Sequence, residues 1–316
     1  MAVAVEIVKR ALLLICLLVS CVLSCRSRPG PVRLVLQPPS TNNYPSYFAS
    51  WLGFYKEERV DVSISQIAGA SKILEAVVGG SADVGGGVYE QTLQMAAEGK
   101  SVVAFVSLLK SPNFAIIAAP GIHNWADLRG KTVGVSSVGS PSQFYLTYLL
   151  NKERVAGVST ATVGMGATAM AALDHGQVDA AVLFGSAITA YLARKPDAVI
   201  LADTRTSEGL QNAFQVTDYP ASCLLAQRSW LEANPESAKK VTRAVLRAMA
   251  WIREHSAEEI LARVPSAGDP AAELAAIRLA KPMYSVDGRI NKESAEAVRA
   301  VVGLKVDVQG TFLNLK

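Results

Sequence analysis

The sequence is poor in the residues that metal and redox sites need. Its 316 residues include three histidines and four cysteines. The histidines, His123, His175 and His255, are scattered and show no metal-binding spacing such as H-x-x-x-H. Three of the cysteines precede residue 26, so Cys223 is the one that remains for a folded domain. The sequence therefore predicts no metal site, no cofactor and no disulfide framework.

An excess of either charge is also lacking. The formal net charge is +4 and no basic stripe with interleaved aromatic residues occurs, which argues against a nucleic-acid partner. Gly130-Lys131-Thr132 is not a phosphate-binding loop, because Trp125 stands where that motif requires glycine and the predicted strand follows the motif. No G-x-S-x-G nucleophile elbow is present. Hydrophobic residues make up 50% of the chain, which is long enough for two globular domains of ~150 residues each.

Long apolar runs are missing apart from one short run near the N-terminus. Residues 11–19 are all apolar and directly follow Lys9 and Arg10. This run is shorter than the ~20 residues of a membrane-spanning helix. A basic segment followed by a short apolar run is typical of a signal peptide, and we expect one at residues 1–20.

Two cysteines follow this leader in sequences similar to the bacterial lipobox, in which a small residue precedes a cysteine that becomes lipidated. Cys21 has the more typical residues before it, and Cys25 has the more typical polar sequence after it. We expect one of them, with Cys21 favoured, to carry a lipid at the start of a tether that covers residues 21–31.

From residue 32 onward, short apolar runs alternate with helical segments, as in α/β proteins with a mostly parallel sheet. After residue 229 the sequence is almost entirely helical. We expect this C-terminal helical segment to pack back on the first part of the fold. The predicted strands cover residues 32–36, 60–64, 82–84, 102–106, 114–118, 132–135, 160–163, 180–183, 199–201 and 222–226.

Two interruptions of the alternation predict two crossings between lobes. The strand at 114–118 has no long helix before it and ends at Pro120-Gly121, where we place the first crossing. The return crossing is expected near Asp218-Tyr219-Pro220. The predicted lobes are therefore residues 32–118 with 217–316, and residues 119–216.

Glycine-rich and polar turns follow the carboxyl ends of the predicted strands, the edge at which open α/β sheets bind ligands. After the strand at 132–135, Ser140 is a suitable N-cap and Pro141 a suitable first helical residue. Unpaired N–H groups at such a helix start favour an anionic or polar ligand. We expect the turns to form an interlobe cleft whose ligand-binding residues are Asn42, Asn43, Tyr44, Gly69, Ser71, Gly86, Gly87, Tyr89, Lys110, Ser136, Ser137, Ser140, Ser142, Phe184 and Tyr219.

Five stretches spread along the chain also carry a family resemblance. They are YPSYFASWLGFYKEERVDV at 44–62, GGSADVG at 79–85, IHNWADLRGKTVGVSSVGS at 122–140, ALDHGQVDA at 172–180 and the segment from NPE to WI at 234–252. In this order they resemble the solute-binding proteins of ABC importers in the nitrate/sulfonate/bicarbonate (taurine-type) family. One departure is Arg59, which stands where the family usually has glycine.

The resemblance implies a two-lobed type II periplasmic-binding-protein fold with two hinge crossings, and a binding protein instead of an enzyme. The ligand would be a small anionic or polar solute of the sulfonate/taurine, nitrate or bicarbonate class, held partly by the serine turn. A monomer anchored by its lipid at the outer face of the cytoplasmic membrane or in the periplasm would deliver the solute to an ABC permease.

Three alternatives remain open from the sequence. The ligand could be a thiamine-related pyrimidine or another aromatic heterocycle, stacked on Tyr44, Tyr89 or Phe184. The protein could be an enzyme on the same fold, in the way that related desulfinases use a nucleophilic cysteine, for which Cys223 is the candidate. It could also be a ligand-sensing subunit of a signalling partner.

Overall fold

A computed structural model describes residues 30–265 and 269–315 of the chain. From Val32 onward the chain forms one compact unit. The predicted signal peptide and both candidate lipidation sites, Cys21 and Cys25, lie outside the described residues.

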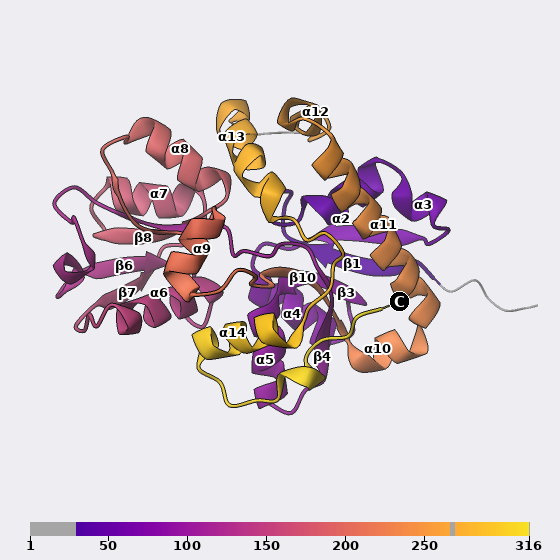
Figure 1. Cartoon of the computed structure of the whole chain (residues 1–316). Coiled ribbons are helices and arrows are strands. Elements are labelled where there is room, and N and C mark those ends of the chain that lie inside the picture. Colours follow the sequence, from indigo (N-terminus) through magenta and orange to yellow (C-terminus); the bar gives the residue numbers. More distant parts are fainter. Residues whose placement is uncertain (1–29, 266–268, 316) are drawn as a thin grey trace, which may run out of the picture. The chain divides into compact units, whose positions relative to one another are not determined.

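Two five-stranded sheets organise this unit, and each forms the centre of one lobe (Figure 1). The first sheet has the strand order β2-β1-β3-β10-β4. β1 pairs in parallel with β2 and β3, whereas β10 runs antiparallel to β3 and β4. The strands are β1 (Val32–Leu36), β2 (Val62–Gln66), β3 (Val84–Val88), β4 (Val102–Ser107) and β10 (Ser222–Gln227). The helices of this lobe are α2 (Tyr44–Trp51), α3 (Phe54–Glu57), α4 (Ala70–Val78), α5 (Tyr89–Ala97), α10 (Arg228–Ala233), α11 (Pro235–Glu254), α12 (Ala257–Leu261), α13 (Pro270–Ala280) and α14 (Lys292–Val302).

The second sheet has the strand order β7-β6-β8-β5-β9. β6 pairs in parallel with β7 and β8, and β5 runs antiparallel to β8 and β9. The strands are β5 (Phe114–Ala118), β6 (Thr132–Val135), β7 (Ser159–Thr162), β8 (Ala180–Phe184) and β9 (Val199–Asp203). The helices are α6 (Pro141–Lys152), α7 (Ala167–Asp174), α8 (Ser186–Arg194) and α9 (Ser207–Phe214).

The first crossing lies one strand earlier than the sequence predicted. β5 was expected in the first lobe, but it pairs with β8 and β9 of the second sheet, so residues 108–113 connect the lobes. β4 and β5 are both buried along their whole length, as continuous apolar runs predict. Because no helix separates them, the sequence does not show which sheet β5 joins, and the hydrogen-bonding partners decide it.

The return crossing between β9 and β10 contains residues 218–220 and pairs with the first crossing. The N–H of Tyr219 donates to the carbonyl of Lys110 at 3.0 Å, and the N–H of Ala221 donates to that of Leu109 at 2.9 Å. On its other side the first crossing joins the C-terminal segment, where Lys110 N–H donates to the Met283 carbonyl at 2.9 Å. Three segments distant in sequence therefore form the hinge.

The C-terminal helices contact both lobes. α11 packs against α2 and α3 of the first lobe, as expected for a segment that folds back on it. α13 also packs against α8, and α14 against α6, so two of these helices reach the second lobe (Figure 1). They lie on either side of the hinge as additional contacts between the lobes.

Three local features of the structure were not expected from the sequence. The helical segment after β1 begins at Tyr44 and is divided at Gly53, whose φ of 79° lies in the left-handed region. The short strand expected at 82–84, followed by a glycine turn, is instead β3, which runs through the glycines to Val88. The helix α9 was not predicted; Thr206 caps it by accepting a hydrogen bond from the N–H of Gly209 at 3.0 Å.

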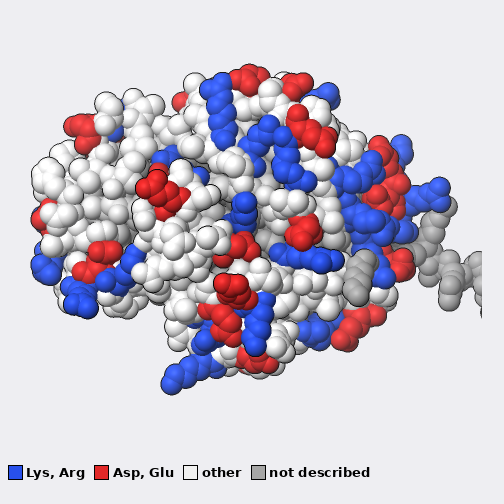
Figure 2. Space-filling model, in the orientation of Figure 1, with Lys and Arg blue, Asp and Glu red and all other residues white. Residues whose placement is uncertain are grey.

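Acidic and basic side chains alternate on the visible surface of the first lobe (Figure 2). Arg243 of α11 pairs with Glu58 at 2.7 Å, and Arg247 lies 3.3 Å from the other oxygen of the same carboxylate. Such exposed pairs contribute about 0–1 kcal/mol each, and their mixture of signs matches the small net charge. Within the described residues, no helix combines the length and apolarity that a bilayer crossing requires.

Candidate functional site

The loops that follow β1 and β8 meet at the boundary between the lobes. Asn113 of the first crossing donates its side-chain amide to Asn42 Oδ1 at 2.8 Å and to Thr41 Oγ1 at 3.2 Å. Its carbonyl accepts from the N–H of Gly185, just before α8, at 3.3 Å. Asn113 has a φ of 51°, a left-handed conformation that asparagine tolerates better than most residues. This residue therefore ties the hinge to one loop of each lobe.

Glu90, the second residue of α5, is completely buried where the lobes touch. Its Oε1 atom accepts hydrogen bonds from the hydroxyls of Tyr145 and Tyr219, each at 2.7 Å. Tyr145 belongs to α6 of the second lobe, and Tyr219 to the return crossing. The second carboxyl oxygen, Oε2, has no hydrogen-bond partner among the described residues. An acidic group of the first lobe thus binds the second lobe through one oxygen only.

Aromatic rings surround this carboxyl group. Phe114, the first residue of β5, stacks on Tyr145 with 4.6 Å between ring centroids and an interplanar angle of 8°. Phe214 stacks on Tyr219 at 5.0 Å and 26°. Phe184 lies 6.2 Å from Phe114 at a tilted angle. These rings pack against one another, and Phe114, Tyr145, Phe214 and Tyr219 are buried, so the cluster is a core between the lobes around the carboxyl group.

Burial controls the electrostatics of this region. It raises the pKa of Glu90, although the hydrogen bonds from Tyr145 and Tyr219 favour the ionised form. Burial also raises the pKa of the Cys223 thiol, and the charge of Glu90 acts in the same direction. Burial raises the pKa of the Asp218 carboxyl as well, whereas the positive charge of Lys110 acts to lower it. The site therefore favours neutral forms of its own acids.

The serine turn between β6 and α6 is stabilised by its own hydroxyls. Ser142 Oγ accepts from the N–H of Ser136 at 2.9 Å and lies 2.7 Å from Ser140 Oγ. Ser140 Oγ donates to the carbonyl of Ser137 at 2.6 Å. Ser140 and Ser142 are buried, whereas Ser136 and Ser137 are half-buried. The pair Ser136 and Ser137 is therefore the accessible part of the turn.

Three other predicted ligand residues make contacts that stabilise the first lobe. Tyr44 donates to Glu273 Oε1 of α13 at 2.6 Å. The Tyr89 hydroxyl lies 2.5 Å from Thr311 Oγ1 in the C-terminal segment. Asn43 closes its own loop by accepting from the N–H of Ser40 and donating to the carbonyl of residue 37. These contacts within the protein explain the positions of the three side chains, and no bound ligand is needed to explain them.

Two of the glycines predicted to contact the ligand have a packing role in the first lobe. A Cβ on Gly86 would lie 2.5 Å from Leu36 Cδ2, and one on Gly87 would lie 2.6 Å from Leu225 Cδ1. Both glycines are therefore needed for packing around β3. Gly69, with a φ of 101°, precedes α4, and Ser71 is exposed in the first turn of that helix.

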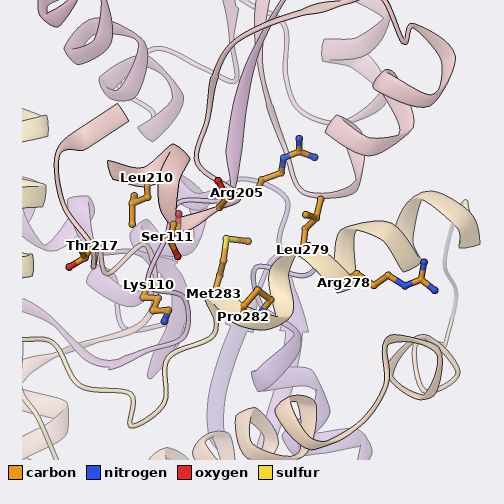
Figure 3. Close-up of a pocket in the computed structure, with 11 residues that line it drawn as sticks. Lys110, Ser111, Arg205, Leu210, Thr217, Arg278, Leu279, Pro282 and Met283 are labelled. Atoms are coloured by element: carbon orange, nitrogen blue, oxygen red, sulfur yellow. The ribbon is translucent and has the colours of Figure 1, made fainter. Parts of the chain in front are cut away.

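Lys110 lies at a different place, in a pocket of about 220 Å³ beside the hinge (Figure 3). The pocket shares no lining residue with the Glu90 site. In Figure 3 the side chains of Leu279 and Met283 extend into the pocket, whereas the guanidinium groups of Arg205 and Arg278 point away from it. The lining residues are Lys110, Ser111, Arg205, Thr206, Ser207, Leu210, Thr217, Arg278, Leu279, Pro282 and Met283.

Several residues of the site were not among those chosen from the sequence. Glu90 stands beside the chosen Tyr89 and is the one charged residue between Asp83 and Glu98. A single acid in an otherwise uncharged stretch was a usable signal. No comparable signal marked Asn113 or Tyr145, whose roles depend on partners in the other lobe.

Comparisons with known proteins identify a family model and several relatives. A family model described as NMT1/THI5 like matches residues 40–259. YtlA of Bacillus subtilis (strain 168), a candidate binding protein by its name, is 24% identical over 269 residues, which cover 82% of this chain and 78% of YtlA. The 4-amino-5-hydroxymethyl-2-methylpyrimidine phosphate synthase of Aspergillus parasiticus is 25% identical over 239 residues, 72% of this chain and 68% of the synthase.

Solved structures share the fold. A protein from Bordetella bronchiseptica RB50 has 34% identity and a TM-score of 0.82, covering 90% of this chain and 94% of its own. The alkanesulfonate-binding protein SsuA from Xanthomonas axonopodis pv. citri, solved with MOPS, has 19% identity and a TM-score of 0.74, covering 91% of this chain and 99% of its own. The expected type II periplasmic-binding-protein fold is confirmed.

Proposed function

The chain belongs to the NMT1/THI5-like family, and on that premise we propose that it is the extracytoplasmic solute-binding protein of an ABC importer. The observation that carries this proposal is the contact of Glu90 with Tyr145 and Tyr219, which joins the lobes at the carboxyl ends of their parallel strands. A solute held between the lobes would favour closure about the hinge, since it can shift the equilibrium only by binding the closed form more tightly.

The N-terminal sequence supports the proposed location. A basic segment and a short apolar run are typical of export, and Cys21 or Cys25 would then anchor the mature chain to the membrane through a lipid. In this position a monomer would pass its solute to a permease in the cytoplasmic membrane.

The proposed ligand is a small anionic or polar solute of the sulfonate/taurine, nitrate or bicarbonate class. The half-buried Ser136 and Ser137 in the turn before α6 support it, because this turn leads into a helix N-terminus, which favours negative charge. A thiamine-related pyrimidine is the second candidate. The pyrimidine named in the synthase relatives and the half-buried ring of Phe184 favour it.

Binding is proposed in preference to catalysis, although several relatives are named as synthases. The cysteine considered as a nucleophile, Cys223, is completely buried in β10. Burial raises the pKa of its thiol, which keeps it in the poorly nucleophilic protonated form. A catalytic role for this thiol therefore has no support in its surroundings.

A thermal-shift screen tests the proposal. The protein is screened against three sets: sulfonates including taurine, inorganic anions, and aminopyrimidines. A solute at ~100 times its Kd stabilises the native state by about 2.7 kcal/mol. We expect members of one set to raise the melting temperature and members of the others to leave it unchanged. The absence of a shift with all three sets would contradict the proposed function.

A further inference from the structure

We propose that the pocket beside the hinge is a second binding site, which takes a small organic anion with a short apolar chain. It is the pocket of about 220 Å³ to which Lys110, Leu279 and Met283 contribute, and we call it the hinge pocket (Figure 3). The inference goes beyond the proposed function, because the hinge pocket shares no lining residue with the Glu90 site. Either proposal can therefore fail without the other.

The walls of the hinge pocket come from all the segments that meet at the hinge. Lys110 and Ser111 belong to the first crossing, and Thr217 lies directly before the return crossing. The start of α9 forms the wall on the side of the second lobe. The end of α13 and the turn that follows it form the wall on the side of the first lobe. An occupant would therefore contact both lobes and both connections between them.

The interior of the hinge pocket is mostly apolar. Leu210 and Met283 are buried, and the side chains of Leu279 and Met283 extend into the space (Figure 3). Ligand pockets commonly have volumes of about 300–1,000 Å³, so a volume of about 220 Å³ limits the occupant to a small molecule. A short alkyl chain suits this lining, since each buried methylene strengthens binding about 4-fold.

The charged residues that line the hinge pocket are all basic. The lining contains three bases and, within the described residues, no acid. The guanidinium groups of Arg205 and Arg278 are each paired with a carboxylate and point away from the space (Figure 3). Lys110 is half-buried and forms no salt bridge in the described part of the chain. Its charge acts on Asp218, but burial shifts that carboxyl towards its neutral form. Lys110 is therefore available to an anionic group, and a charge-assisted hydrogen bond is among the stronger polar contacts.

Calorimetric titration with three compounds tests the chemical class of the occupant. Hexanoate carries both a chain and a charge, acetate lacks the chain, and hexan-1-ol lacks the charge. We expect hexanoate to bind at least ~10-fold more tightly than either of the others, because the chain and the charge each contribute at least that factor. No binding of hexanoate, or an affinity equal to that of acetate or hexan-1-ol, would overturn the inference.

Three variants show where hexanoate binds. Lys110→Met removes the charge but keeps an unbranched side chain, and should weaken hexanoate binding at least ~10-fold. Leu279→Trp enlarges a half-buried side chain that extends into the pocket, and should abolish binding. Lys72→Met is the control, because Lys72 is exposed on α4, and it should bind hexanoate as the wild type does. Thermal unfolding checks that each variant is folded, and the comparison of Lys110→Met with Lys72→Met decides the question even if Leu279→Trp does not fold.

Hydrogen exchange locates the occupant independently of the variants. The N–H groups of Tyr219 and Ala221 bond to the first crossing, and their exchange requires local opening of the hinge. Saturating hexanoate should slow exchange at both amides in the wild type and leave it unchanged in Lys110→Met at the same concentration. Hexanoate binding that survives Lys110→Met, or that leaves these amides unaffected, would locate the anion elsewhere and overturn the inference, while the proposed function would stand.

Discussion

The hydroxyl of Tyr145 lies 2.7 Å from Glu90 Oε1, and this hydrogen bond links a helix of the second lobe to a helix of the first. The hydroxyl of Tyr219, in the return crossing, reaches the same oxygen at the same distance. One buried acceptor thus connects both lobes and the hinge, so changes at these three residues should affect closure and stability together.

Removal of either tyrosine hydroxyl should destabilise the fold. Tyr145→Phe and Tyr219→Phe each withdraw one donor from a buried acceptor, for an expected cost of about 1–3 kcal/mol in the free energy of unfolding. Because the two donors share Oε1, the double variant should deviate from additivity by about 0.5–3 kcal/mol. Denaturant unfolding of the three variants measures both quantities.

Tyr148→Phe is the matched control, since Tyr148 lies on the same helix and its hydroxyl makes no hydrogen bond among the described residues. Its effect should remain within about 0.5 kcal/mol. Equal losses at Tyr148 and Tyr145 would show that the bond to Glu90 contributes nothing.

The raised pKa of Glu90 predicts a specific dependence of stability on pH. Below its ordinary value of 4.5 the carboxyl is protonated in both states. Above that value the unfolded chain releases the proton first, so the native state holds more protons and the free energy of unfolding falls as pH rises. Glu90→Gln removes this contribution, and its stability relative to wild type should therefore increase as the pH rises above 4.5. A stability difference between the two proteins that is constant across this range would contradict the assigned protonation.

Asn113 should tolerate few replacements because its backbone and its side chain both matter. Asn113→Ala loses the hydrogen bonds to Asn42 and Thr41 and places alanine at a φ of 51°. Asn113→Gly loses the same bonds but places glycine at this φ. The left-handed conformation costs residues with a Cβ roughly 1–2 kcal/mol, and glycine avoids that cost. We expect Asn113→Gly to be the more stable variant by about 1 kcal/mol, as measured by thermal unfolding. Equal stability would mean that the backbone conformation carries no cost.

Gly87→Ala should disturb the packing of β3. The added Cβ would lie 2.6 Å from Leu225 Cδ1 and would also approach Gln91 Oε1, which accepts the N–H of Val88 at the start of α5. Overpacking of this kind costs about 1–3 kcal/mol. Gly310→Ala is the control, because no atom lies within 4 Å of its added Cβ. Similar stabilities of the two variants, measured by denaturant unfolding, would refute the packing role.

Hydrophobic periodicity predicted most of the fold. The ranges 32–36, 114–118 and 132–135 agree with β1, β5 and β6, because strands buried on both faces appear as continuous apolar runs. The sheet to which β5 belongs could not be predicted in this way, since it depends on pairing with β8 and β9, which are 62 or more residues later in sequence.

The departure from the family pattern at Arg59 has a local explanation. Its φ of 56° is a conformation that glycine adopts without strain, which is the residue expected there from the family resemblance.

The candidate site was predictable only in part. The loops at the strand ends were identified, but the choice of Tyr89 over Glu90 depended on helix phase. Adjacent residues on a helix point about 100° apart, because there are 3.6 residues per turn. In this protein Tyr89 contacts the C-terminal segment and Glu90 contacts the second lobe. The isolated acid at position 90 is the one local signal, because the partners that fix this phase, Tyr145 and Thr311, are distant in sequence from both residues.

The most direct test of the account is a calorimetric titration of the protein with the solute that gives the largest thermal shift, followed by mass spectrometry of that solute. A binding protein that closes around its ligand should show saturable binding to a single class of site and should return the solute chemically unchanged. Chemical conversion of the solute, or no measurable binding by any sulfonate, inorganic anion or aminopyrimidine, would contradict the assignment as a solute-binding protein.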